Sequence, residues 1–100
     1  MKAVEFKVFK EKDLESKCCD YARSHGLAAV KLEKNKNTGI PDRLFIGRGG
    51  KVLFVEFKRK NKGVASHEQL FWLKYLGDNG MLCDDYDEFK VKIRQHFKIV

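Results

Sequence analysis

The amino-acid sequence predicts an α/β domain in which a mixed β-sheet is flanked by helices, in the order α-β-β-β-α-β-α. Apolar side chains recur at helical spacing near both ends of the chain, and short runs rich in β-branched and aromatic residues lie between them. The chain has 100 residues, of which 43% are hydrophobic and only one is proline. We therefore expect a single globular domain over residues 1–100.

The first predicted helix runs from about Glu11 to His25, because its apolar residues fall on one helical stripe and Gly26 is placed to end it. Three short strands should follow, each bounded by polar or glycine-rich segments: residues 27–32, 41–46 and 51–58. Residues 47–50, with the sequence Gly-Arg-Gly-Gly, join the last two strands, so these strands should pair as a hairpin.

The second half of the chain should hold two helices and one strand. Ser66 and Gln69 form a Ser-x-x-Gln capping box that starts a helix running to about Leu76. Residues 77–80, Gly-Asp-Asn-Gly, stop this helix, and residues 81–83 form the last predicted strand. Four apolar positions at helical spacing indicate an amphipathic final helix: Tyr86, Phe89, Ile93 and Phe97.

The chain is basic. Lysine and arginine outnumber aspartate and glutamate by 21 to 14, which gives a net charge of +7 and a pI near 9.4. A charge of this sign on a small surface suits a polyanionic partner such as nucleic acid. A basic protein without such a partner fits the composition equally well, so charge alone does not decide the question.

The expected compartment is the cytoplasm. No signal-peptide pattern occurs at the N-terminus, and no apolar run approaches the ~20 residues of a membrane span. Cys18, Cys19 and Cys83 lack metal-ligand spacing and are odd in number, so we expect reduced and mostly buried thiols. No organic cofactor is expected, because the sequence has no phosphate-binding glycine loop, and no Ser/His/Asp set or zinc motif occurs.

A carboxylate and an ammonium group end the third predicted strand. Because residues two apart point to the same side of a strand, Glu56 and Lys58 share one face, while Val55 and Phe57 share the other. Burial of either charge costs several kcal/mol unless the group is paired or bound to a metal. The alternative is that Glu56 and Lys58 simply reach solvent at the end of the strand.

Asp42 supplies a second carboxylate near the same place. In the predicted hairpin the first strand starts beside the end of the second, so Asp42 should approach Glu56 and Lys58. Two adjacent carboxylates repel each other, and a hard divalent cation such as Mg²⁺ removes that penalty. The cation would acidify a bound water, while Lys58 orients the nucleophile or neutralises developing charge. This pattern indicates metal-dependent phosphodiester hydrolysis.

Two segments carry a resemblance to a known family. Gly39-Ile40-Pro41-Asp42 followed by Val55-Glu56-Phe57-Lys58 resembles the signature of the PD-(D/E)xK nuclease superfamily. The ordered pattern from about Glu11 to Phe89 resembles its stand-alone VRR-NUC branch of bacteria and phages, with Glu15 in the first helix and Gln69 at the start of the next. The resemblance implies a restriction-endonuclease-like fold.

The resemblance implies a role for each matching residue of the two segments. Asp42 and Glu56 would bind Mg²⁺ or Mn²⁺. The Phe57 carbonyl would be a further ligand, and Lys58 would be the catalytic lysine.

Two residues outside these segments have competing interpretations. Glu15 matches the family's helix-one glutamate, which contributes to the metal region directly or through water. Glu11 is the competing candidate, and an exposed helical glutamate is the alternative for either residue. Gln69 would extend the active site, yet a glutamine at this position of a capping box needs no other purpose. The sequence leaves these alternatives open.

Six basic residues lie around the expected site and are candidates for phosphate contacts: Lys31, Lys34, Lys36, Arg43, Lys60 and Lys62. Any of them can instead be a solvated surface residue. A domain of this size offers little surface for reading bases, and phosphate contacts carry no sequence information directly. Recognition of DNA structure is therefore favoured over recognition of sequence.

The sequence thus predicts a Mg²⁺-dependent, structure-selective DNA endonuclease. The resemblance implies branched or four-way (Holliday) junction DNA as the substrate. It also implies a homodimer, which would present two active sites to two strands. A phage-encoded member would act in the host cytoplasm. The competing hypothesis is a non-catalytic nucleic-acid-binding module that keeps the nuclease fold. The joint presence of Asp42, Glu56 and Lys58 favours the enzyme.

Overall fold

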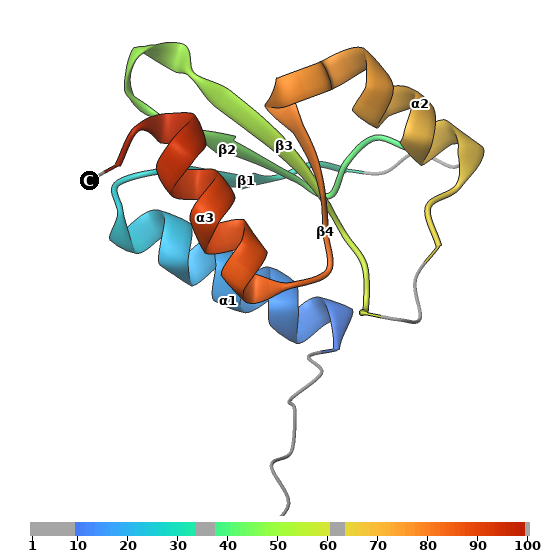
Figure 1. Ribbon diagram of the computed structural model, residues 1–100, viewed down its shortest axis with the longest axis horizontal. Helices are drawn as coiled ribbons and strands as arrows, with labels where there is room; N and C mark the ends of the chain where they lie inside the picture. Colours follow the sequence, from blue (N-terminus) through green and yellow to red (C-terminus); the bar gives the residue numbers. More distant parts are fainter. Residues whose placement is uncertain (1–9, 34–37, 61–63, 100) are drawn as a thin grey trace, which may run out of the picture.

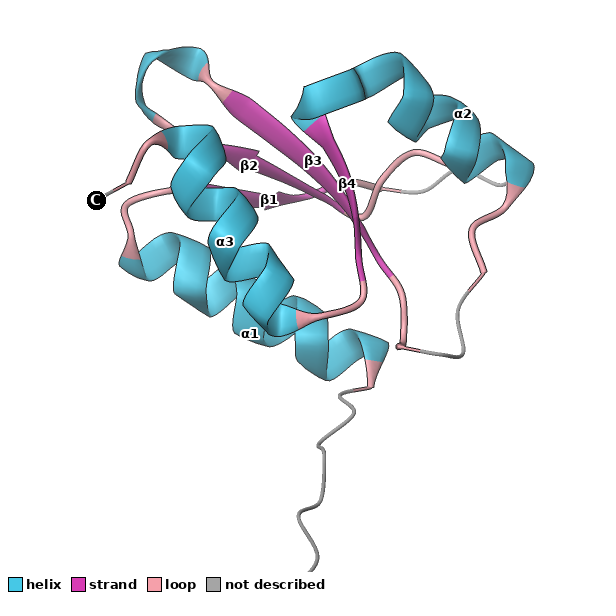
Figure 2. Cartoon of the chain, viewed as in Figure 1, coloured by secondary structure: helices cyan, strands magenta, loops and turns pink. Residues whose placement is uncertain are grey.

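A computed structural model describes residues 10–33, 38–60 and 64–99 of the chain. Within these residues the chain forms three α-helices, four strands and two short 3-10 helices (Figure 1, Figure 2). In chain order the elements are α1 (Glu11–Ser24), β1 (Ala28–Lys31), β2 (Arg43–Ile46), η1 (Arg48–Gly50), β3 (Val52–Phe57), α2 (His67–Leu76), η2 (Gly77–Asn79), β4 (Gly80–Cys83) and α3 (Tyr86–Phe97). In this part of the chain no helix combines the length and the apolar character that crossing a bilayer requires.

The strands form one mixed sheet in the order β1-β2-β3-β4. β1 runs antiparallel to β2 and β2 antiparallel to β3, with Arg43 opposite Val55 in the second pair. β4 runs parallel to β3, and α2 lies in the crossover that a parallel connection requires. The predicted α/β domain with a mixed sheet is confirmed, and β3 has a paired strand on each side.

Helices α1 and α3 pack together over the sheet, while α2 lies apart from them and contacts β4 (Figure 1). Alternation along β3 decides which side chains face the α1/α3 pair: Leu53, Val55 and Phe57 are fully buried. Phe89 of α3 lies at the centre of this core, with its ring centroid 5.3 Å from that of Phe45 and 6.3 Å from that of Phe57. The core therefore lies between the sheet and the α1/α3 pair.

Local sequence signals account for the helix ends. Ser66 and Gln69 form the predicted capping box: the Ser66 hydroxyl accepts from the Gln69 backbone N–H at 3.1 Å, and the Gln69 side-chain oxygen accepts from the Ser66 N–H at 2.9 Å. Asp85 caps α3 by accepting from the Asp87 N–H at 3.2 Å. α1 ends before Gly26, whose φ of 80° is a left-handed conformation that favours glycine.

Cys18, Cys19 and Cys83 are free thiols buried in the core, as the sequence predicts. A hydrogen bond with Cys83 and burial raise the pKa of the Cys18 thiol, and burial raises the pKa of the Cys19 thiol. Both thiols therefore stay protonated at neutral pH and pack as small apolar side chains.

Phe89→Ala should lower the free energy of unfolding by about 3–5 kcal/mol, because it removes a fully buried ring and leaves a cavity. Val91→Ala, on the same helix and 53% exposed, should change it by no more than about 0.5 kcal/mol. Urea denaturation followed by circular dichroism measures both variants. Equal losses would contradict a core centred on Phe89.

Candidate active site

Asp42 lies just before β2, beside the end of β3. The hairpin register pairs Arg43 with Val55, and continuing it by one residue sets Asp42 opposite Glu56. The Asp42 Oδ2 atom accepts a hydrogen bond from the backbone N–H of Phe57 at 2.8 Å. The hairpin thus brings the two carboxylate residues to neighbouring positions on adjacent chain segments.

Glu56 is only 1% exposed, although it carries a carboxylate. Its Oε2 atom accepts a hydrogen bond from the Gln69 amide nitrogen at 2.9 Å and lies 3.6 Å from the Lys58 Nζ atom. The Lys58 side chain is itself 17% exposed. The alternative in which Glu56 reaches solvent is therefore wrong: the carboxylate lies inside the protein, where these partners replace part of its lost hydration.

Gln69 makes both contacts considered for it, one with the helix cap and one with the candidate site. Its side-chain oxygen completes the capping box with Ser66, while its amide nitrogen donates to Glu56. The partly buried face of α2 consists of residues at helical spacing: Gln69, Trp72, Leu73 and Leu76. The Gln69 side chain thus links the first turn of α2 to the buried end of β3 by a hydrogen bond. A catalytic role for Gln69 stays a prediction.

Glu15 and Asp42 line one cavity of about 580 Å³, together with Lys31, Leu32 and Glu33, whereas Glu56 and Lys58 do not line it. The Glu15 Oε2 atom accepts a hydrogen bond from Arg43 Nε at 2.6 Å, and the two side chains are 19% and 18% exposed. Glu11 is exposed and is not among the residues that line this cavity. Of the two candidate acids in α1, Glu15 is therefore the one beside Asp42, and Arg43 neutralises its charge.

The six basic residues proposed for phosphate contacts have different surroundings. Lys31 is exposed and lines the cavity, whereas Arg43 is engaged by Glu15. Lys60 is 48% exposed, and its Nζ atom lies 3.7 Å from Asp85 Oδ2. Three of the six lie outside the described residues: Lys34, Lys36 and Lys62. Contact of any of these residues with DNA stays a prediction.

The donor atoms at this site suit a hard divalent cation. Asp42 and Glu56 offer carboxylate oxygens at adjacent positions, and Mg²⁺ is commonly held by one or two carboxylates together with waters and substrate phosphates. Within residues 10–33, 38–60 and 64–99, no three His, Cys, Asp or Glu side chains are grouped so as to hold a metal ion. Metal binding would therefore depend on Asp42 and Glu56. Glu15 would not be a direct ligand through Oε2, because that oxygen accepts the hydrogen bond from Arg43.

A second connection, absent from the sequence-based expectations, joins the loop before β2 to α2. The Trp72 indole N–H donates to the backbone oxygen of Thr38. Gly39 has a φ of +64°, and a Cβ there would lie 2.5 Å from the backbone carbonyl carbon of Glu68, so glycine is required. The available signals were this glycine and a tryptophan on the sheet-facing stripe of α2. The loop that leads to Asp42 is thereby fixed to α2.

No protein-family model matches the chain, and no curated protein matches it. What the site can do must therefore follow from its own groups. These are two carboxylates, one of them buried, and an ammonium group beside the buried one. Such groups hold a hard cation and stabilise negative charge.

Ser66→Ala removes only the helix cap and should lower the free energy of unfolding by about 1 kcal/mol. Gln69→Leu should cost about 1–3 kcal/mol more, because it also leaves the buried Glu56 carboxylate without its amide donor. Urea denaturation at one pH and ionic strength measures both variants. Equal losses would show that the hydrogen bond between Gln69 and Glu56 contributes nothing to stability.

Proposed function

We propose that this chain is a Mg²⁺-dependent, structure-selective DNA endonuclease with a restriction-endonuclease-like fold. The observation that carries the proposal is the group formed by Asp42, Glu56 and Lys58 at the end of β3. A charge buried at this cost to stability is expected where the charge serves chemistry. The resemblance of the two motif segments to PD-(D/E)xK nucleases supports the same function.

The proposed chemistry assigns a part to each group. Asp42 and Glu56 hold Mg²⁺ or Mn²⁺, with the Phe57 carbonyl as a further ligand. When bound, the cation supplies an acidified water and positive charge at the scissile phosphate. Lys58, 3.6 Å from Glu56 Oε2, orients the attacking water or donates to the phosphate oxygen on which charge develops. Gln69 holds the Glu56 carboxylate in place and is therefore a positioning residue.

Charge and shape support a nucleic acid as the substrate. The net charge of +7 favours a polyanion. The cavity of about 580 Å³ is lined by one cation, Lys31, and by the carboxylates of Glu15, Glu33 and Asp42, so a phosphate would enter it together with the divalent cation that offsets these charges. Because Arg43 holds Glu15, this acid acts on the metal region through water.

An exposed aromatic surface on α2 supports a substrate with unpaired bases. Phe71 is 64% exposed and Tyr75 is 79% exposed, and their rings lie nearly parallel, with centroids 6.3 Å apart. Both belong to the helix whose first turn carries Gln69. Unpaired bases stack on such rings with little dependence on sequence. Branched DNA with flaps or splayed ends offers such bases. The four-way (Holliday) junction, whose bases can all be paired, is proposed from the resemblance instead, and a homodimer would present two sites to its two strands.

The alternative function is a non-catalytic module that binds nucleic acid and keeps this fold. Binding of phosphates needs exposed cations and no acids. It does not require a buried Glu56 beside Lys58, or Asp42 at the same strand end. The arrangement therefore favours the enzyme over the binding module.

The cysteines support a reducing compartment such as the cytoplasm. Cys18, Cys19 and Cys83 are all free thiols. Disulfides are rare where thiols are kept reduced, so the unpaired state of these residues fits that setting.

Cleavage of four-way-junction DNA should require Mg²⁺ or Mn²⁺ and should stop in EDTA. Lys58→Ala should slow cleavage by about 10²–10³-fold, the usual effect of removing one group that stabilises charge in the transition state. Asp42→Ala should abolish cleavage and bind DNA at least as tightly, because it removes a negative charge that faces phosphates. Gel assays of cleavage and of binding to the same junction measure both effects.

Lys98→Ala and Asp87→Ala serve as matched controls, because both residues are exposed and lie on or beside α3. Neither variant should change the cleavage rate. Activity that survives EDTA, or that Asp42→Ala and Lys58→Ala leave unchanged, would rule out the endonuclease. Binding without cleavage under every metal condition would instead favour the non-catalytic module.

Lys31→Ala should weaken DNA binding and should reduce the slope of log K against log salt by about 0.9, the contribution of one phosphate contact. Fluorescence anisotropy of a labelled junction between about 50 and 200 mM salt measures the slope. Lys98→Ala is the control and should leave the slope unchanged. An unchanged slope for Lys31→Ala would remove Lys31 from the phosphate contacts.

A further inference from the structure

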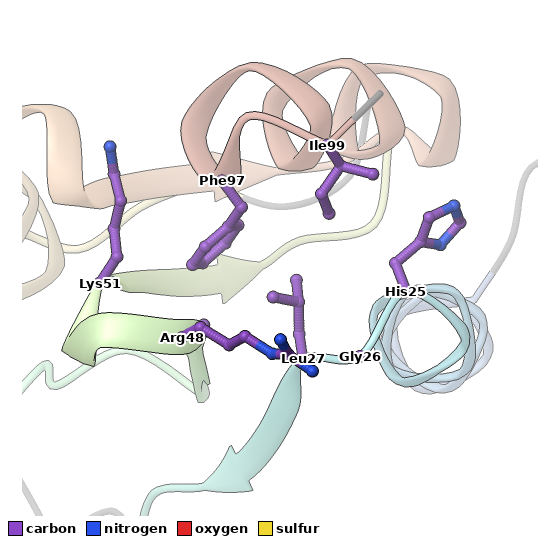
Figure 3. A pocket seen from close by; sticks show the side chains of 8 residues that line it. His25, Gly26, Leu27, Arg48, Lys51, Phe97 and Ile99 are labelled. Carbon is purple, nitrogen blue, oxygen red and sulfur yellow. The ribbon is translucent and has the colours of Figure 1, made fainter.

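A pocket lies at the opposite end of the β2–β3 hairpin from Asp42 and Glu56. Its volume is about 330 Å³, and it is lined by the turn after α1, the hairpin turn and the end of α3 (Figure 3). At ~3.3 Å per residue along β3, Lys51 at the pocket and Glu56 at the active site lie roughly 16 Å apart. No residue that lines the pocket belongs to the candidate active site.

The floor of this pocket is apolar and closely packed. Leu27, Phe97 and Ile99 point toward one another there (Figure 3). Gly47 permits this packing, since a Cβ at this position would lie 2.7 Å from Phe97 Cδ1 and 3.3 Å from Leu27 Cδ2. Lys98 has a left-handed φ of 52°, which turns the chain back after α3 and brings Ile99 to the pocket. The backbone is thus shaped around an apolar hollow.

The rim of the pocket is basic. His25, Arg48 and Lys51 line it, and no carboxylate is among the described residues that do so. Arg48 extends along the opening toward Leu27 (Figure 3), and Arg48 and Lys51 are exposed. Positive charge above an apolar floor suits an anion attached to a flat, apolar group.

We propose that this pocket binds a nucleoside 5′-monophosphate, either free or as the 5′-phosphorylated end of a DNA strand. The phosphate is bound by the Arg48 guanidinium, whose fork matches its oxygens, while Lys51, whose side chain extends away from Arg48 (Figure 3), adds positive charge at the rim. The base packs on the Phe97 ring and on the aliphatic side chains of Leu27 and Ile99. The volume of about 330 Å³ is within the range of small-ligand pockets. The site shares no residue with the proposed nuclease site and does not depend on it.

Isothermal titration calorimetry in EDTA tests the proposal, because EDTA prevents nucleotide binding through a metal at the active site. Deoxyadenosine monophosphate should bind with one-to-one stoichiometry. Deoxyadenosine reaches only the floor and inorganic phosphate only the rim, so each should bind at least about tenfold more weakly. Absence of saturable binding by deoxyadenosine monophosphate would overturn the proposal.

Arg48→Ala should weaken nucleotide binding about tenfold, because it removes a charged hydrogen-bond donor to the phosphate, and Lys51→Ala should weaken it less, because it removes only positive charge at the rim. Lys74→Ala, an exposed lysine on α2, and Asp87→Ala, an exposed aspartate on α3, are controls that should leave binding unchanged. The thermal midpoint of each variant confirms that the fold is kept. Binding that neither Arg48→Ala nor Lys51→Ala affects would overturn the proposal.

Two single-stranded oligonucleotides of one sequence, with a 5′-phosphate or a 5′-hydroxyl end, separate the two sources of the ligand. A preference for the phosphorylated end that Arg48→Ala removes assigns the pocket to strand ends. Binding of deoxyadenosine monophosphate without such a preference assigns it to the free nucleotide. If deoxyadenosine monophosphate fails to bind while Arg48→Ala weakens both oligonucleotides equally, the rim is a contact for the DNA backbone, and the pocket proposal is wrong.

Discussion

The burial of the Glu56 carboxylate constrains how the rest of the chain can pack. A charge inside a protein costs several kcal/mol unless other groups replace its hydration. Lys58, at the same end of β3, supplies a positive charge beside the carboxylate. The hydrogen-bond donor, the amide of Gln69, comes from another element. α2 must therefore begin beside the end of β3, and the capping box holds the amide at that position. One carboxylate thus sets where the crossover helix between β3 and β4 starts.

Along β3, the core residues and the buried carboxylate face opposite sides of the sheet. Leu53 and Val55 point into the core formed with α1 and α3, whereas Glu56 points toward α2. Alternation along one strand produces this division, because neighbouring residues face opposite sides. Phe57 joins the two regions: its ring packs against the core, while its backbone N–H binds Asp42. Packing of that ring therefore also positions one of the two carboxylates.

Much of this arrangement follows from short segments of sequence. The final helix Tyr86–Phe97, the capping box at Ser66 and the hairpin around residues 47–50 depend on spacing and turn chemistry within a few residues. The two faces of β3 follow from alternation, and hairpin register follows from the turn. For this reason the sequence alone predicts the approach of Asp42 to the end of β3.

The partners of the charged groups could not be predicted in the same way. Arg43 binds Glu15, which lies 28 positions away in the sequence, and Gln69 reaches Glu56 from a separate helix. A long polar side chain can reach several partners, and the one it meets depends on where two distant elements cross. The basic pocket under Arg48 has the same origin, because its walls come from three separate segments. Local patterns therefore specify the elements and the strand faces, and the packing of the whole chain selects which side chains meet.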